Sequence, residues 1–228
     1  MLLTIDDVLS QDELLQVRAL LLAQQWDSGQ WTAGPQAALV KNNQQLPEQA
    51  PGLPELRHRV LDALNRSALF FAAALPLKIL PPFFNRYSGA SNSYGLHTDN
   101  AMRRVPGQGA SYVRSDVSAT LFLSEPDSYE GGVLTIDDTF GRHGVKPRAG
   151  SLVLYPSSSL HCVTPVTGGE RVSCFLFLQS MVADAGKRRL LYDMDMALLQ
   201  LRQDLGETPA VVQLTGTYHN LLRRWAQT

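Results

Sequence analysis

The middle of this 228-residue chain restricts its fold more than any other part. Between residues 78 and 180, short runs of β-branched and aromatic residues alternate with clusters of Gly, Pro, Asn and Asp. Runs of this length, interrupted at these intervals, are typical of antiparallel all-β folds. We predict strands at residues 82–87, 117–123, 133–136, 152–155, 162–166 and 172–179. Several strands packed as two sheets form a sandwich or jelly roll.

Helical patterns precede and follow this β-rich region. Ser10 and Glu13 can form a capping box, in which each side chain satisfies an unpaired backbone amide, and apolar residues recur behind it at helical spacing. A second helix is expected after Pro54, with an apolar stripe that continues to Phe71. Beyond residue 184 the helical spacing returns, and a last helix is expected to begin at Pro209.

These patterns divide the chain into three parts. Residues 1–77 are expected to form N-terminal helices that support the core, residues 78–180 the jelly-roll core, and residues 181–228 a C-terminal helical segment. The expected fold class is therefore mainly β with flanking helices (α+β).

Composition argues against several classes of protein. Lys and Arg number 20 against 21 Asp and Glu, so the net charge of −1 gives no electrostatic reason to expect nucleic acid or an acidic membrane as a partner. Cys162 and Cys174 form no Cys-x-x-Cys pair, which argues against a disulfide scaffold and a Cys-rich zinc site. The longest apolar run, residues 68–77, is about half the ~20 residues that span a bilayer, and the N-terminus lacks the pattern of a secretory signal. We therefore expect a cytoplasmic protein in a reducing compartment.

Two histidines, an aspartate and an arginine form the candidate site. His97 and Asp99 are two residues apart, so on a strand both side chains would point to the same face. His161, on a distant predicted strand, would complete a set of two histidines and one carboxylate, which leaves metal positions open for a chelating cosubstrate and dioxygen. Arg171 stands at the head of the next strand, and its planar fork suits a carboxylate such as the far end of 2-oxoglutarate. Together they predict a non-haem Fe(II) oxygenase.

The histidine–aspartate pair, the later histidine and the arginine that follows it resemble, in this order, the Fe(II)/2-oxoglutarate dioxygenases. The closer similarity is to the prolyl 4-hydroxylase-like branch, and within it to the bacterial PKHD-type hydroxylases. The stretches that support it are residues 84–87, 94–99, 116–124, 129–132 and 155–161, with 41–45 and 218–223 outside the β-rich region. The resemblance therefore covers most of the chain.

This resemblance implies a set of roles. His97, Asp99 and His161 would bind Fe(II). Arg171 would bind 2-oxoglutarate, and Tyr87 would contribute its hydroxyl to the same carboxylate. It also implies a double-stranded β-helix and L-ascorbate as a reductant for the iron. The reaction implied is hydroxylation by dioxygen of an unidentified protein, peptide or small-molecule substrate, with release of succinate and CO2.

Other interpretations stay open at this point. A cupin-like metal enzyme or a zinc hydrolase could use the same three ligands without 2-oxoglutarate, and a non-catalytic jelly roll would keep the fold without the chemistry. Residues 100–115 are expected to form a lid that reads the substrate. The apolar C-terminal helices can dock on the β core or on a second subunit, so a homodimer is one option.

Overall fold

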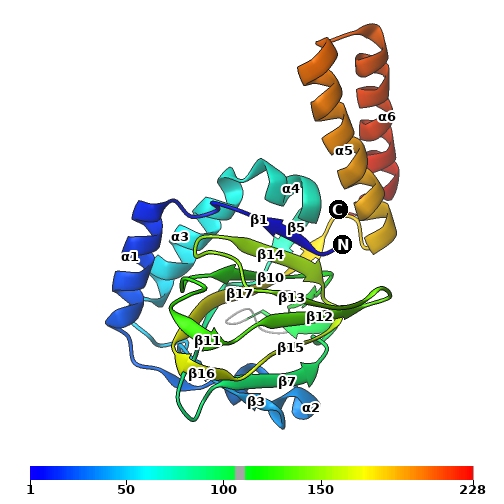
Figure 1. Ribbon diagram of the computed structural model, residues 1–228. Coiled ribbons are helices and arrows are strands. Elements are labelled where there is room, and N and C mark those ends of the chain that lie inside the picture. The colour runs from blue at the N-terminus through cyan, green and yellow to red at the C-terminus, as the bar shows by residue number, and fades with distance from the viewer. Residues whose placement is uncertain (106–110, 228) are drawn as a thin grey trace.

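The computed structural model describes residues 1–105 and 111–227 and consists of two facing β-sheets with helices around them (Figure 1). The strands of the larger sheet are β1 (Leu3–Ile5), β2 (Asp27–Ser28), β4 (Gln44–Gln45), β5 (Pro76–Ile79), β6 (Phe83–Tyr87), β10 (Val117–Phe122), β14 (Leu152–Pro156) and β17 (Arg171–Ser180). Within the described residues their order is β1-β14-β10-β17-β6-β4-β2, and β5 also pairs with β17. All these pairings are antiparallel.

The smaller sheet faces the larger one. Its strands are β3 (Lys41–Asn42), β7 (Ser93–His97), β12 (Leu134–Asp138), β13 (Gly141–Val145) and β15 (Leu160–Val163), in the order β13-β12-β15-β7-β3. Two short pairs are separate from both sheets: β8 (Met102–Arg104) with β9 (Tyr112–Arg114), which lies near β17, and β11 (Tyr129–Gly131) with β16 (Val166–Gly169). The arrangement confirms the predicted fold class, a β core with helices before and after it in the chain.

Helices cover the outer face of the larger sheet. They are α1 (Gln11–Leu22), α3 (Leu53–Arg66) and α4 (Ala68–Ala74), while η1 (Gly29–Thr32) and α2 (Pro35–Ala38) lie near the smaller sheet. Side chains alternate along β17, so Cys174, Leu176 and Leu178 belong to the core shared with these helices. Arg171 and Ser173 point the other way, into the space between the sheets. The functional pocket is therefore built from the inner face of a strand whose outer face is held by the helical layer.

The N-terminal helices begin as predicted but divide differently. The Ser10–Glu13 capping box is present at the start of α1, which confirms that prediction. The single apolar stripe predicted to reach Phe71 is wrong, because the chain breaks at Ser67 into α3 and α4. Ser67 has an extended backbone, and its hydroxyl accepts the amide of Phe70, so it caps a new helix instead of continuing the old one. Phe70 is therefore buried and Phe71 exposed.

The predicted strand at residues 162–166 is also divided. β15 ends at Val163 in the smaller sheet, and β16 begins at Val166 in a separate pair with β11. Pro165 separates them, and proline has no amide hydrogen to continue the ladder. The stretch at residues 41–45 likewise supplies one strand to each sheet, β3 and β4.

The C-terminal segment is a pair of antiparallel helices, α5 (Ala185–Leu205) and α6 (Pro209–Trp225), that extends away from the β core (Figure 1). Thr208 caps α6 and Pro209 is its first residue, as predicted. Leu191 and Tyr218 lie in the apolar contact between the two helices. No helix in the described ranges is long and apolar enough to cross a membrane.

The predicted lid at residues 100–115 contains residues 106–110, which lie outside the described residues. On either side of them β8 and β9 pair antiparallel.

Candidate active site

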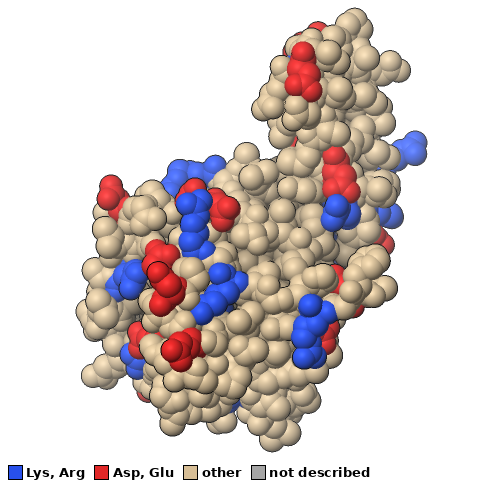
Figure 2. Space-filling model, viewed as in Figure 1, with Lys and Arg blue, Asp and Glu red and all other residues tan. Residues whose placement is uncertain are grey.

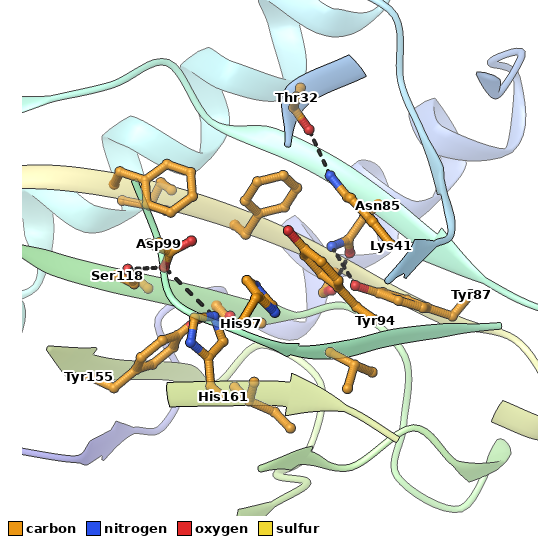
Figure 3. Close-up of a pocket in the computed structure, with 18 of the residues that line it drawn as sticks. Thr32, Lys41, Asn85, Tyr87, Tyr94, His97, Asp99, Ser118, Tyr155 and His161 are labelled. Carbon is orange, nitrogen blue, oxygen red and sulfur yellow. Dashed lines mark hydrogen bonds and ion pairs between the residues drawn. The ribbon is translucent and has the colours of Figure 1, made fainter. Parts of the chain in front are cut away.

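β7 and β15 are neighbours in the smaller sheet, and His97 and His161 are paired directly across them. Both imidazoles are buried, and their ring centroids lie 4.2 Å apart (Figure 3). Oδ2 of Asp99 lies 3.7 Å from Nε2 of His161, and one possible ligand atom from each of the three residues lies within 4.8 Å of the others. The structure thus gathers all three predicted metal ligands at one point.

The backbone route to this point differs from the prediction. His97 is the last residue of β7, and Asp99 lies in the unpaired segment that follows, so the prediction that both lie on one strand is wrong. Asp99 reaches the histidines because the chain leaves the sheet at this place, where no ladder hydrogen bonds fix its direction.

Backbone carbonyls orient both imidazoles. The Nδ1–H of His97 donates to the carbonyl oxygen of Gly95 at 2.7 Å, and the Nδ1–H of His161 donates to that of Ser159 at 2.9 Å. Because a carbonyl can only accept, Nδ1 of each ring carries a hydrogen, so in the neutral imidazole Nε2 is the nitrogen that presents a lone pair to a metal. Burial and the neighbouring His161 lower the pKa of His97 to about 4, so this imidazole is neutral at physiological pH.

The Asp99 carboxylate is held from two sides. Ser118 on β10 donates its hydroxyl to Oδ2 at 2.6 Å, and Nη2 of Arg103 donates to Oδ1 at 3.0 Å. The Ser118 hydroxyl also lies 2.7 Å from that of Ser157. These contacts fix the carboxylate in one orientation, which is the usual environment of a ligating carboxylate.

Two tyrosine rings pack against the cluster of His97, Asp99 and His161. Tyr94 stacks on His97 with 3.6 Å between ring centroids, and Tyr155 meets His161 edge-on at 4.9 Å. Burial, with the charge of Asp99, raises the pKa of both phenols, so both stay neutral. The rings shield the histidines from water without adding charge.

Arg171 is 1% exposed and carries hydrogen-bond donors that the protein leaves unused. Its Nη1 donates to Ser173 at 2.7 Å, Ser173 donates in turn to Oδ1 of Asn85, and Asn85 donates to the Tyr87 hydroxyl at 3.3 Å. Nε and Nη2 of Arg171 have no partner among the described residues. Burial raises the pKa of the nearby Tyr129 phenol, the charge of Arg171 opposes this rise, and the Tyr129 hydroxyl is likewise without a hydrogen-bond partner among the described residues. A buried guanidinium with two free donors fits a carboxylate.

One pocket of about 550 Å³, including its mouth, contains all five predicted site residues. The other residues that line it are Thr32, Lys41, Asn85, Tyr94, Arg103, Ser118, Ala119, Thr120, Leu134, Tyr155, Val163, Ser173, Phe175, Leu176 and Phe177. Lys41, Asn85 and Ser118 are not among the site residues predicted from the sequence. The signal for each was its place in a stretch that supported the resemblance: 41–45 for Lys41, 84–87 for Asn85 and 116–124 for Ser118. Their contacts in the site become visible only once the facing strands are known.

Comparisons with known proteins agree with this chemistry. The 2OG-Fe(II) oxygenase superfamily model matches residues 82–179, and the PKHD-type hydroxylase C-terminal domain matches residues 185–227. A PKHD-type hydroxylase of Azoarcus sp. (strain BH72) is 70% identical over 227 residues, which cover 99% of each chain. One from Nitrosomonas europaea is 68% identical over 226 residues, again 99% of each. The chain belongs to the PKHD-type hydroxylases. It is therefore a 2-oxoglutarate-dependent dioxygenase that uses Fe(II), which confirms the resemblance and sets aside the cupin-like, hydrolase and non-catalytic interpretations.

Solved structures share the fold of this PKHD-type hydroxylase. A 2OG-Fe(II) oxygenase family oxidoreductase from Burkholderia pseudomallei has a TM-score of 0.52 at 16% identity, over 77% of this chain and 82% of the other. A prolyl hydroxylase from Trichoplax adhaerens, in complex with a hypoxia inducible factor peptide fragment, has a TM-score of 0.53 at 17% identity, over 83% and 86% of the two chains.

Proposed function

We propose that His97, Asp99 and His161 hold the Fe(II) of this dioxygenase, and that Arg171 with Tyr87 binds the distal carboxylate of 2-oxoglutarate. The observation that carries the proposal is the buried Arg171 guanidinium, which has two unused donors and opens into the same pocket as a cluster of two histidines and one carboxylate. A structural arginine buried this deeply would have its donors satisfied within the protein.

Bound Fe(II), 2-oxoglutarate and dioxygen together supply the oxidation, which inserts one oxygen into a substrate C–H bond and releases succinate and CO2. The protein supplies orientation. Gly95 and Ser159 fix the imidazoles through their carbonyls, and Ser118 with Arg103 fixes the Asp99 carboxylate. Such contacts hold ligand atoms in place before the metal arrives.

The cosubstrate end of the pocket is equally ordered. Ser173 and Asn85 connect Arg171 to the Tyr87 hydroxyl, so guanidinium and phenol are held relative to each other. Burial raises the pKa of Tyr87, which keeps its phenol protonated and able to donate to a carboxylate oxygen. This chain of hydrogen bonds thus positions two different donors, the Arg171 guanidinium and the Tyr87 hydroxyl, for one carboxylate.

Succinate formation from 2-oxoglutarate tests the proposal without knowledge of the substrate. The wild-type protein is expected to release succinate slowly in the presence of Fe(II) and dioxygen, and His161→Ala is expected to lose this activity. Succinate formed without Fe(II), or at an unchanged rate in His161→Ala, would overturn the assignment.

Ascorbate and a cytoplasmic location are further parts of the proposal. Ascorbate would return the iron to Fe(II) after a turnover that fails to hydroxylate substrate, so activity should decay faster in its absence. Both cysteines are free, Cys174 buried and Cys162 partly exposed, which suits a reducing compartment.

A homodimer through the C-terminal helices is supported by their exposed apolar side chains, which are Leu190, Leu199, Leu205, Val212 and Leu214. Figure 2 shows a mostly tan surface over the upper part of this helix pair, with a red group near its tip and red and blue groups toward its base. Light scattering on the wild type and on Leu190→Glu tests this, with a dimeric mass expected only for the wild type.

A further inference from the structure

Lys41 places a buried amino group, cationic when protonated, inside the active-site pocket. It lies at the start of β3, directly opposite Tyr94 of β7, and only 4% of it is exposed. Its Nζ donates to the Thr32 hydroxyl at 2.7 Å (Figure 3). It also donates to Oε1 of Gln45 at 3.1 Å. An ammonium group has three N–H donors, so these two bonds leave one donor for a ligand.

No carboxylate pairs with Lys41 in the described part of the chain. The carboxylate of the pocket, Asp99, is bonded to Arg103 and Ser118 and belongs to the metal cluster. Burying a cation without a counter-ion costs stability, so a chain that keeps one in its active site gains something from it elsewhere. Burial and the nearby Arg103 lower the pKa of Lys41 to about 7, against the opposing effect of Asp99.

Aromatic rings surround this amine. Nζ lies 5.5 Å from the centre of the Phe175 ring and 5.3 Å from that of Tyr94. Phe177 lies two residues further along the same face of β17, and the Arg103 guanidinium carbon lies 3.4 Å from the centre of its ring. This end of the pocket therefore combines apolar surface with positive charge.

The Lys41 end is separate from the end proposed for 2-oxoglutarate. The two cations have separate hydrogen-bond partners, Ser173 for Arg171 and Thr32 with Gln45 for Lys41. The anion assigned to Lys41 is accordingly a second group, distinct from the carboxylate that Arg171 binds.

We infer that Lys41 binds an anionic group of the hydroxylation substrate, and that this substrate is an organic anion whose apolar part lies against Phe175 and Phe177. The inference rests on the proposed function, since it places the substrate beside 2-oxoglutarate bound at Arg171. The spare N–H of Lys41 donates to the anion, and the anion supplies the counter-charge that the protein lacks.

A purely structural role is the alternative. Lys41 is in β3 of the smaller sheet and Gln45 is in β4 of the larger, so their hydrogen bond also ties the sheets together. A structural role requires only that Lys41 donate a hydrogen bond to Gln45, and it gives the pocket no preference for charged over neutral ligands. Charge selectivity therefore separates the two roles.

The experiment uses the full-length protein loaded anaerobically with Fe(II) and saturating 2-oxoglutarate, so that the Arg171 site is already occupied. The probes are 3-phenylpropionate and its uncharged analogue 3-phenylpropanamide, and binding is measured by calorimetry. The wild type should bind the carboxylate at least tenfold more tightly than the amide. Lys41→Met should lose this preference with little change in amide affinity, and Lys41→Arg should restore part of it.

Each variant is first tested for 2-oxoglutarate binding, which also shows that it is folded. Absence of 2-oxoglutarate binding in the wild type would refute the proposed function itself, before any probe is added. With 2-oxoglutarate bound, absence of a carboxylate preference in the wild type, or its persistence in Lys41→Met, would overturn the role of Lys41.

Discussion

Arg171 and Tyr87 are direct partners in the antiparallel ladder between β17 and β6, with the guanidinium carbon 5.1 Å from the centre of the tyrosine ring. The pairing places a permanent cation and a neutral phenol on the same inner face of the larger sheet. Because strand partners cannot slide without shifting every side chain of the sheet, the spacing of these two donors is fixed by the fold.

Removal of the Arg171 guanidinium is expected to weaken 2-oxoglutarate binding selectively. We predict that Arg171→Ala loses about 2–5 kcal/mol of binding free energy, the usual cost of deleting one partner of a buried charged hydrogen bond. Fe(II) affinity should change little, because Arg171 does not contact the histidine cluster. Calorimetric titration measures both. The control is Arg142→Ala, whose exposed arginine pairs with Asp137, neither of which lines the pocket. Equal losses in the two variants would contradict the prediction.

Ser118 is expected to tune metal affinity through Asp99. Ser118→Ala removes the 2.6 Å hydrogen bond to the carboxylate, and loss of such a contact typically costs about 10–100-fold in metal affinity. Competition with a chelator of known Fe(II) affinity gives the value. Ser128→Ala is the matched control, since the hydroxyl of Ser128 is exposed and bonds a backbone carbonyl. Unchanged affinity in Ser118→Ala would show that the carboxylate does not depend on this serine.

Lys41 is expected to make stability depend on pH above neutrality. Its folded-state pKa is about 7, below the ordinary 10.5, so between these values the unfolded chain binds more protons than the folded chain. The unfolding free energy should therefore rise with pH across this window, by at most about 1.4 kcal/mol per pH unit from this residue. Chemical denaturation of the metal-free wild type and of Lys41→Met at pH 7 to 9 measures the difference. We expect the unfolding free energy of the wild type to rise relative to that of Lys41→Met as pH increases. For the control Lys78→Met, which replaces an exposed lysine, the difference in unfolding free energy from the wild type should stay constant. A constant difference for Lys41→Met would contradict the argument from burial.

Arg188 is expected to hold the C-terminal helix pair on the core. It is buried at the start of α5 and donates to the backbone carbonyls of Val182, Ala183 and Asp116. Arg188→Met removes charged hydrogen bonds worth about 1.5–3 kcal/mol each at most, so the unfolding free energy should fall by roughly 2 kcal/mol or more. Limited proteolysis near residue 184 should also accelerate. The exposed neighbour Arg189, paired with Asp193, provides Arg189→Met as a control that should change neither property.

The sequence indicated which residues come together in one pocket better than it indicated the route by which the chain joins them. Alternation along a strand indicates which face His161 occupies, but it contains no information on which strand lies beside it, so its pairing with His97 came only from the structure. For Asp99 the spacing itself was misleading, since the two-residue spacing that suggested a shared strand arises from the last residue of β7 and the unpaired segment after it.

The residues missed by the sequence analysis share one property. Lys41, Asn85 and Ser118 have their roles through partners distant in the chain, such as Ser173 for Asn85 and Asp99 for Ser118. A lysine in a polar stretch is usually exposed, and only the closure of the two sheets around residues 41–45 buries this one. The helix break at Ser67 was missed for a local reason, because apolar spacing continued across a residue that caps a helix as readily as it sits in one.

The most direct measurement is optical. Fe(II) and then 2-oxoglutarate are added anaerobically to the wild type, His97→Ala and Arg171→Ala, and the weak visible charge-transfer band of an iron-chelated keto acid is recorded. We predict the band in the wild type, no band in His97→Ala, and a band in Arg171→Ala only at much higher 2-oxoglutarate concentration. A wild-type protein that binds Fe(II) stoichiometrically yet shows no band, or a band of equal strength in His97→Ala, would contradict the assignment of this pocket as the iron and 2-oxoglutarate site.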